Sequence, residues 1–273
     1  MQIENAAVLD IILNVDGAND DSSLLRGALE LARREHAFLT GLQIVAVNPS
    51  LIGVADASML LDAEEQDALG RRTWWLDLCS KAGTVGDWEV ICGPYIASLA
   101  KRAQLADFVI GRWSTRAHTV IGGAGELARV LFADRAPMLL VPDTWQETLQ
   151  AQRVMIAWNG SGEAARAIKA ALPLLMHAAE VHVLDGALDG LPGISPPCPP
   201  LRAWLARHGV HAHWHAFKGR HDAGRNLQAE ATARQADLLV MGAWGRSRMS
   251  ELLLGGATRW LLEHTRQPLF LAH

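Results

Sequence analysis

The chain has 273 residues, half of them hydrophobic, with 25 basic and 29 acidic side chains and a formal net charge of −4. This composition is typical of a folded globular protein and excludes disordered and collagen-like chains. The negative net charge argues against a general nucleic-acid binder. No apolar run reaches the roughly 18 residues that would indicate a membrane span, and the N-terminal residues include Glu4 and Asp10 where a secretory signal would be basic. The three cysteines are widely separated, so we expect a cytoplasmic protein without disulfides.

Short apolar segments alternate with segments of helical periodicity through the first half of the chain. The predicted strands lie at residues 8–15, 37–47, 88–92, 107–111 and 137–141. The predicted helices lie at residues 24–36, 59–82, 94–104 and 126–133, and Ser22 or Ser23 suits the N-cap of the first. Continuous apolar strands alternating with helices indicate a parallel sheet that is covered on both faces.

The second half repeats this order of elements. Its predicted strands lie at residues 153–158, 180–184, 211–217, 237–241 and 268–271. Its predicted helices lie at residues 163–177, 201–209, 222–235 and 255–265. The polar stretch 143–152 carries no core pattern, so we expect two domains, at residues 1–143 and 152–273.

The two halves differ in charge. Residues 1–150 carry 12 basic and 20 acidic side chains, whereas residues 151–273 carry 13 and 9. The second half is therefore the better candidate for binding a phosphate group.

A glycine-rich segment follows the fourth predicted strand of the second half. Gly242 and Gly245 are followed, after nine residues, by Gly255 and Gly256 at the start of a predicted helix. Glycines let backbone amides approach an anion closely, and a helix N-terminus adds free N–H groups and a partial positive charge. In parallel α/β sheets, ligands bind beyond the carboxyl ends of the strands. This segment therefore predicts a phosphate site.

The spacing G-x2-G-x9-G, followed directly by a helix and a final strand, resembles the nucleotide-binding signature of the universal stress proteins. Residues 154–175 resemble the first strand and helix of that family's domains, and residues 236–273 resemble its C-terminal third. The resemblance extends over nearly the whole chain as two tandem domains. It implies an α/β fold of two doubly wound domains, each a five-stranded parallel sheet of order 3-2-1-4-5 with helices on both faces. It also implies that the two domains pair, commonly through their last strands.

The resemblance implies an ATP or ADP site in the second domain. The residues expected there are Ala157, Asn159, Gly242, Gly245, Arg246, Gly255, Gly256, Ala257 and Thr258. Two of these positions depart from the family pattern: Gly256 stands where ATP-binding members have Ser or Thr, and Asn159 stands where they have an acidic residue that contacts the adenine end. An Asn carbonyl still accepts a hydrogen bond from an exocyclic amine.

The first domain keeps the acidic residue, Asp16, but loses the glycines. Ser114 or Thr115 stands where a glycine is expected, and Ala124 stands at the predicted helix start. We therefore expect this first site to be vestigial and the chain to bind at most one nucleotide.

Two further features have alternative interpretations. His211, His213 and His215 alternate along a predicted strand, so their side chains share one face. They are candidate ligands for zinc or copper, but the polar face of an edge strand is the interpretation we favour, since the third strand is an edge in the implied order. Ser161 is a candidate nucleophile, but the elbow pattern G-x-S-x-G is absent and the position suits a helix N-cap.

Together these features predict a stress-linked regulatory protein that binds ATP or ADP in its second domain. We expect it not to be an enzyme, because no motif supplies a general base beside a positioned water. The expected partners are the adenine nucleotide and the other half of the chain, with a homodimer left open and neither nucleic acid nor membrane. The alternative is a non-nucleotide interaction or scaffold module whose pocket is lost or repurposed.

Overall fold

The computed structural model describes residues 9–15, 23–47, 55–113, 136–142, 144–145, 147–187, 198–219, 222–243 and 256–273. The chain divides into two compact units. The first comprises Met1–Gly111 with Glu147–Leu149, and the second comprises Arg112–Gln146 with Gln150–His273. The limits predicted for the two sequence repeats, 143 and 152, stay a prediction.

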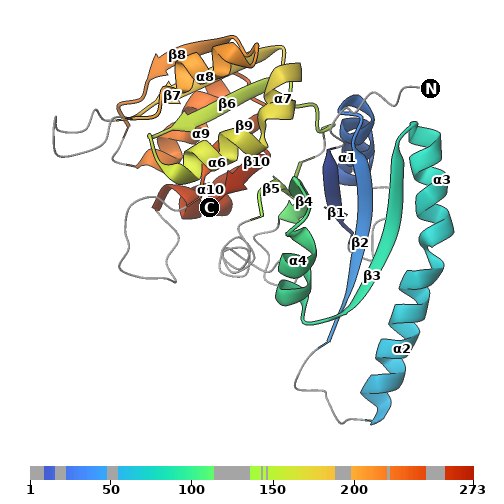
Figure 1. The fold of residues 1–273 in the computed structure, drawn as a ribbon. Helices are drawn as coiled ribbons and strands as arrows, with labels where there is room; N and C mark the ends of the chain where they lie inside the picture. The colour runs from blue at the N-terminus through green and yellow to red at the C-terminus, as the bar shows by residue number, and fades with distance from the viewer. Residues whose placement is uncertain are drawn as a thin grey trace. The chain divides into compact units, whose positions relative to one another are not determined.

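The first unit is built on parallel strands in the order β3-β2-β1-β4 (Figure 1). Its strands are β1 (Asp10–Asn14), β2 (Phe38–Ala46), β3 (Val85–Gly93) and β4 (Phe108–Trp113), the last of which ends in the second unit. Its helices are α1 (Ser23–Arg34), α2 (Ala55–Gly70), α3 (Arg72–Ala82) and α4 (Tyr95–Ala103). Consecutive residues of β1 are fully buried, which requires cover on both faces of the sheet.

A tryptophan cluster packs α3 onto the strands of the first unit. The rings of Trp75 and Trp88 lie 5.7 Å apart, and the indole N–H of Trp88 donates to the carbonyl of Ala68 at 2.8 Å. Gly41 on β2 makes room for these rings, because a Cβ there would lie 2.8 Å from ring atoms of both tryptophans. The cluster therefore depends on a glycine in the middle of a strand.

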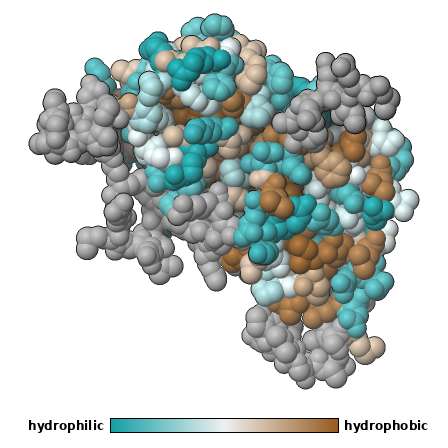
Figure 2. All heavy atoms as spheres, viewed as in Figure 1, coloured by the Kyte–Doolittle hydropathy of each residue, from teal (hydrophilic) through white to brown (hydrophobic). Residues whose placement is uncertain are grey.

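Hydrophobic residues also reach the surface of the first unit, as the brown areas around α2 show in Figure 2. The exposed apolar side chains of α2 include Met59, Leu60 and Leu69.

The single helix predicted over 59–82 is in fact two helices, since Gly70 ends α2 and α3 begins after Arg71. Glycine disfavours the interior of a helix, which accounts for the interruption.

The second unit has the strand order β5-β10-β9-β6-β7-β8. Its strands are β5 (Met138–Pro142), β6 (Arg153–Trp158), β7 (Glu180–Asp185), β8 (Ala212–Ala216), β9 (Leu238–Gly242) and β10 (Leu269–Ala272). Its helices are α6 (Gly162–Ala170), α7 (Leu172–His177), α8 (Leu201–Arg207), α9 (Ala223–Ala233) and α10 (Gly256–His264). The five strands of the second repeat are parallel and follow the order 3-2-1-4-5, which confirms the predicted doubly wound fold.

The last strands of the two sequence repeats pair with each other inside the second unit. β5 and β10 are antiparallel, with Leu269 opposite Leu140 and Leu271 opposite Met138. All the side chains of both strands are buried. The predicted pairing between these two strands is therefore confirmed, and it leaves neither with an open apolar edge at their junction.

Local sequence signals explain where several helices begin. Ser161 is the N-cap of α6, and its hydroxyl accepts a hydrogen bond from the N–H of Ala164 at 3.2 Å. The helix predicted over 163–177 is interrupted at Ala171, because Pro173 lies at the start of α7 and lacks the N–H that a continuous helix requires.

At the other end of the unit, the indole N–H of Trp113 donates to the buried carbonyl of Leu262 on α10 at 2.7 Å. Among the residues that the structure describes, no helix is long and apolar enough to cross a bilayer.

Candidate ligand pocket of the second unit

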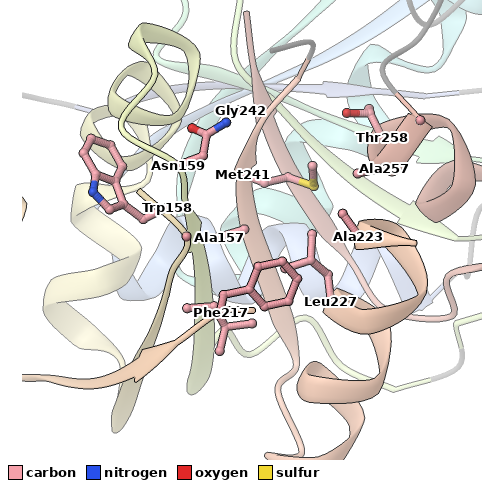
Figure 3. A pocket seen from close by; sticks show the side chains of 13 residues that line it. Ala157, Trp158, Asn159, Phe217, Ala223, Leu227, Met241, Gly242, Ala257 and Thr258 are labelled. Carbon is pink, nitrogen blue, oxygen red and sulfur yellow. The ribbon is translucent and has the colours of Figure 1, made fainter. Parts of the chain in front are cut away.

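A cavity of about 320 Å³ opens at the carboxyl ends of the parallel strands of the second unit (Figure 3). One part of its lining is apolar. It is made by Ala157, Leu184, Phe217, Ala223, Leu227 and Met241. The remaining part is formed by Trp158, Asn159, Gly186, Gly242, Gly256, Ala257 and Thr258. The position is the one expected for a ligand site in a doubly wound sheet, because the strand order reverses between β6 and β9 and ligands bind at that point.

The start of α10 supplies the polar end of the pocket. The N–H groups of Gly256, Ala257 and Thr258 belong to the first turn of the helix, where amides have no partner within the helix and carry a partial positive charge. Thr258 is buried, whereas Gly256 is exposed, and apart from the adjoining helix backbone no described residue has a heavy atom within 4 Å of the position a Cβ would take there. Such a helix start is suited to a phosphate or carboxylate group.

Asn159 lies across the pocket from this helix start, and its orientation is set by the chain itself. Its side-chain oxygen, Oδ1, accepts a hydrogen bond from the backbone N–H of Ser161 at 3.1 Å. The carboxamide nitrogen therefore points the other way, toward the strand that carries Met241, as Figure 3 shows. Asn159 thus offers the pocket a donor without charge, in place of the charged acceptor that an aspartate would provide.

Gly242 is required by packing as well as by any ligand. A Cβ at this position would lie 2.5 Å from the backbone nitrogen of Ala164 and 2.7 Å from the backbone carbon of Glu163. The end of β9 is thus pressed against the first turn of α6. This contact gives a structural reason for one glycine of the motif, independent of phosphate binding.

Six residues predicted for the site are brought together in the pocket. They are Ala157, Asn159, Gly242, Gly256, Ala257 and Thr258. The other three, Gly245, Arg246 and Gly255, lie outside the described residues, as do Asp16, Ser114, Thr115 and Ala124 of the first repeat. That these residues hold a nucleotide stays a prediction.

Sequence reasoning missed much of the apolar lining. Leu184 and Gly186 come from the end of β7, Phe217 follows β8, and Leu227 lies on α9. A signal for two of them was present, since Gly186 and Phe217 directly follow strands whose carboxyl ends line the site. Leu227 offered no such signal, because its place on the helix face is indistinguishable from that of a core leucine.

The histidines are arranged differently from the prediction. His211 precedes β8 and is exposed, whereas His213 and His215 lie on β8 beside His182 of β7. Within the described parts of the chain, no group of three or more His, Cys, Asp or Glu side chains is arranged to hold a metal ion. The partner of the β8 histidines is thus a third histidine from the neighbouring strand.

The fold and the pocket define the class of this protein: it has a doubly wound α/β sheet with a ligand-sized hollow where the parallel strands end. Residues 204–273 match the model of the Universal stress protein family, which confirms the resemblance over that segment. No curated protein matches the chain.

Solved structures extend the likeness in fold to nearly the whole chain. A universal stress protein from Archaeoglobus fulgidus DSM 4304 superposes with a TM-score of 0.71 at 15% identity, covering 96% of this chain and 95% of that one. A proposed universal stress protein from Pseudomonas aeruginosa UCBPP-PA14 gives 0.61 at 14% identity, covering 97% and 93%. A protein of unknown function from Pseudomonas aeruginosa PAO1 gives 0.59 at 13% identity, covering 97% and 92%.

Proposed function

We propose that this chain is a stress-linked regulatory protein that binds an adenine nucleotide, ATP or ADP, in the pocket of its second unit without efficient turnover. The stress-linked role is supported by the family match over residues 204–273. The nucleotide is supported by the pocket, which lies beside the predicted motif.

One observation carries the proposal: a single cavity combines an apolar hollow with the N-terminus of a nine-residue helix. The side chains of Leu184, Phe217 and Leu227 offer flat apolar contact for a base. The first-turn amides of α10 offer hydrogen bonds and partial positive charge to phosphate oxygens. A molecule with a planar apolar ring at one end and an anion at the other satisfies both parts.

The chemistry of the described lining supports the proposed absence of efficient turnover. None of the described residues that line the pocket is a carboxylate, histidine or lysine. Nucleotide hydrolysis depends on a group that positions a water and on charges that stabilise the transferring phosphoryl group. This lining provides hydrogen-bond donors and apolar surface, which suit binding rather than hydrolysis.

Calorimetric titration of the full chain with ATP, ADP and cyclic AMP tests the proposal. The matched variants are Ala257→Asp and Ala257→Asn, which differ by one charge at almost the same size. An aspartate in the first turn of α10 favours the helix and repels a phosphate. We expect wild type to bind ATP or ADP with a stoichiometry of one, Ala257→Asn to bind with similar affinity, and Ala257→Asp to lose at least tenfold.

Two results would overturn the proposal. If no nucleotide binds wild type, and none is found by mass spectrometry after denaturing the purified protein, the pocket serves the non-nucleotide interaction module instead. If Ala257→Asp binds ATP as tightly as Ala257→Asn, the phosphates do not lie at α10.

A further inference from the structure

Three histidines form a cluster on β7 and β8, the two neighbouring strands at one edge of the second unit's described sheet. We call His182, His213 and His215 the histidine cluster. His182 on β7 lies opposite His213 on β8, with the two rings stacked at 5.2 Å, and the rings of His182 and His215 lie 5.3 Å apart. The Nδ1 atom of His182 is 3.1 Å from the Nε2 atom of His215. The other ring nitrogen of His182 is 3.4 Å from a carboxylate oxygen of Glu180.

The short distance between His182 and His215 allows one hydrogen bond, with a single proton between the two facing nitrogens. A hydrogen bond between two imidazole nitrogens requires one to donate and the other to accept. When both rings are fully protonated, both nitrogens become donors and both rings carry a positive charge. The contact then changes from attractive to repulsive.

The surroundings of His215 favour its neutral form. Burial is the main cause that lowers the pKa of His215, and the positive charge of Arg234 on α9 adds to it, while Glu230 on the same helix opposes it. Glu230 forms an ion pair with Arg234, so the two opposite charges partly offset each other's effect on His215. On the remaining sides lie Glu180 of β7 and, opposite it on β6, Arg153, which donates to the side chain of Gln235. Burial and the neighbouring positive charge therefore lower the pKa of His215 and disfavour its charged form.

The cluster shares a sheet face with the wall of the ligand pocket. Side chains two residues apart in a strand point to the same face. His182 is therefore followed on that face by Leu184, and the face that carries His213 and His215 continues to Phe217. Leu184 and Phe217 both line the pocket. Helix α9 also reaches both places, because Leu227 lines the pocket, Glu230 lies one turn further along the helix, and Arg234 is the C-cap residue that follows it.

β8 is the element best placed to respond to charge in the cluster. It is the outermost strand of the second unit's described sheet and is paired with β7. The N–H of Phe217 donates to the carbonyl of Asp185 at 2.8 Å, just beyond the last pair of the two strands. A repulsion between β7 and β8 would therefore act directly on the segment that holds Phe217 in the pocket wall.

We propose that the histidine cluster is a proton-sensitive contact that controls the pocket. When His182 and His215 are both positively charged, their repulsion separates β8 from β7 and withdraws Phe217 from the pocket wall. Acidification then weakens ligand binding. This last consequence rests on the proposed nucleotide function, whereas the loosening of β8 does not.

Hydrogen exchange of the full chain, followed by mass spectrometry, tests the loosening of β8. Peptides covering residues 212–217 are compared at pH 7.5 and 5.5 after correction for intrinsic exchange rates, without ligand. The test variant is His215→Gln, which keeps a hydrogen-bonding side chain but does not titrate. The matched control is His208→Gln, since His208 lies on the neighbouring α8 region, bonds to the carbonyl of Trp204 at 2.8 Å and is not part of the cluster.

We expect protection of residues 212–217 to fall at least tenfold on acidification in wild type and in His208→Gln, and less than threefold in His215→Gln. Equal falls in all three proteins would overturn the proposal, as would the absence of any fall in wild type. If His215→Gln does not fold, His182→Gln replaces it, because it removes the other imidazole of the same contact. The same expectation and the same refutation apply to it.

A second measurement separates the link to the pocket from the proposed function. ATP affinity is titrated at both pH values in wild type and His215→Gln, and the two proteins are compared at the same pH because the terminal phosphate also titrates in this range. We expect wild type to lose about tenfold more affinity than the variant at pH 5.5. If ATP binds both proteins with the same pH dependence, the link to the pocket is wrong. If ATP binds neither at any pH, the proposed function fails, and the exchange of β8 alone decides whether the cluster acts on that strand.

Discussion

Replacing Gly256 by serine should strengthen nucleotide binding, because it adds a hydroxyl at the start of α10 in the place where the family pattern has one. The described residues leave space for the change, since apart from the adjoining helix backbone none of their heavy atoms lies within 4 Å of the position of the new Cβ. A hydrogen bond to a charged phosphate is worth about 1.5–3 kcal/mol. This corresponds to roughly a ten- to hundredfold gain in affinity, at about 1.4 kcal/mol per decade.

The same change should raise stability slightly. Serine is more favourable than glycine in a helix by about 0.5 kcal/mol. The control is Gly70→Ser at the end of α2, where a Cβ also has space but which is not among the described residues that line the pocket. Calorimetric titration with ATP measures the affinity, and urea unfolding measures the stability. An affinity that is unchanged or weaker in Gly256→Ser, with wild-type unfolding behaviour, would refute the placement of phosphate at α10.

Three further predictions concern the packing that supports the pocket and the first unit. Gly41→Ala should destabilise the protein by about 1–3 kcal/mol in urea unfolding, because its Cβ would press on the two tryptophan rings beside it; a wild-type midpoint would contradict this. Trp113→Phe should cost about 1–3 kcal/mol by leaving a buried carbonyl of α10 without its donor, and an unchanged free energy of unfolding would show that water replaces the indole. Burial raises the pKa of Cys79 to about 11, so iodoacetamide at pH 8 should label exposed Cys92 first, and equal labelling rates in the folded protein would argue against this burial.

The strands of the fold could be predicted because their signal is local. In the strand predicted at 237–241, for example, the four residues after Asp237 are all apolar, and this pattern indicates a strand buried on both faces, as β9 is. Ser161 is a similar case, since a serine before a helical segment predicts a cap from its own chemistry. In both cases the residue types next to each other in the chain contain the information.

The remaining features depend on residues that are far apart in the chain. His182 was not predicted as a neighbour of His213 and His215, because the register between β7 and β8 decides which side chains meet. The sequence shows that position 242 is a glycine, but only the approach of α6 to the end of β9 shows that packing requires it. Phe217 and Leu227 are likewise ordinary apolar residues until the fold brings them to one cavity.

The antiparallel pairing of β5 with β10 has a consequence for how the chain can be divided. A fragment that starts at the predicted second domain, residue 152, lacks β5 and leaves the main-chain groups of β10 without their partner on that side. Leu269, Phe270 and Leu271 are apolar, so that open edge would favour association with another chain. A fragment that starts at residue 136 retains β5 beside β10. For the isolated second unit, the 16 residues before the repeat boundary therefore decide whether β10 keeps its antiparallel partner.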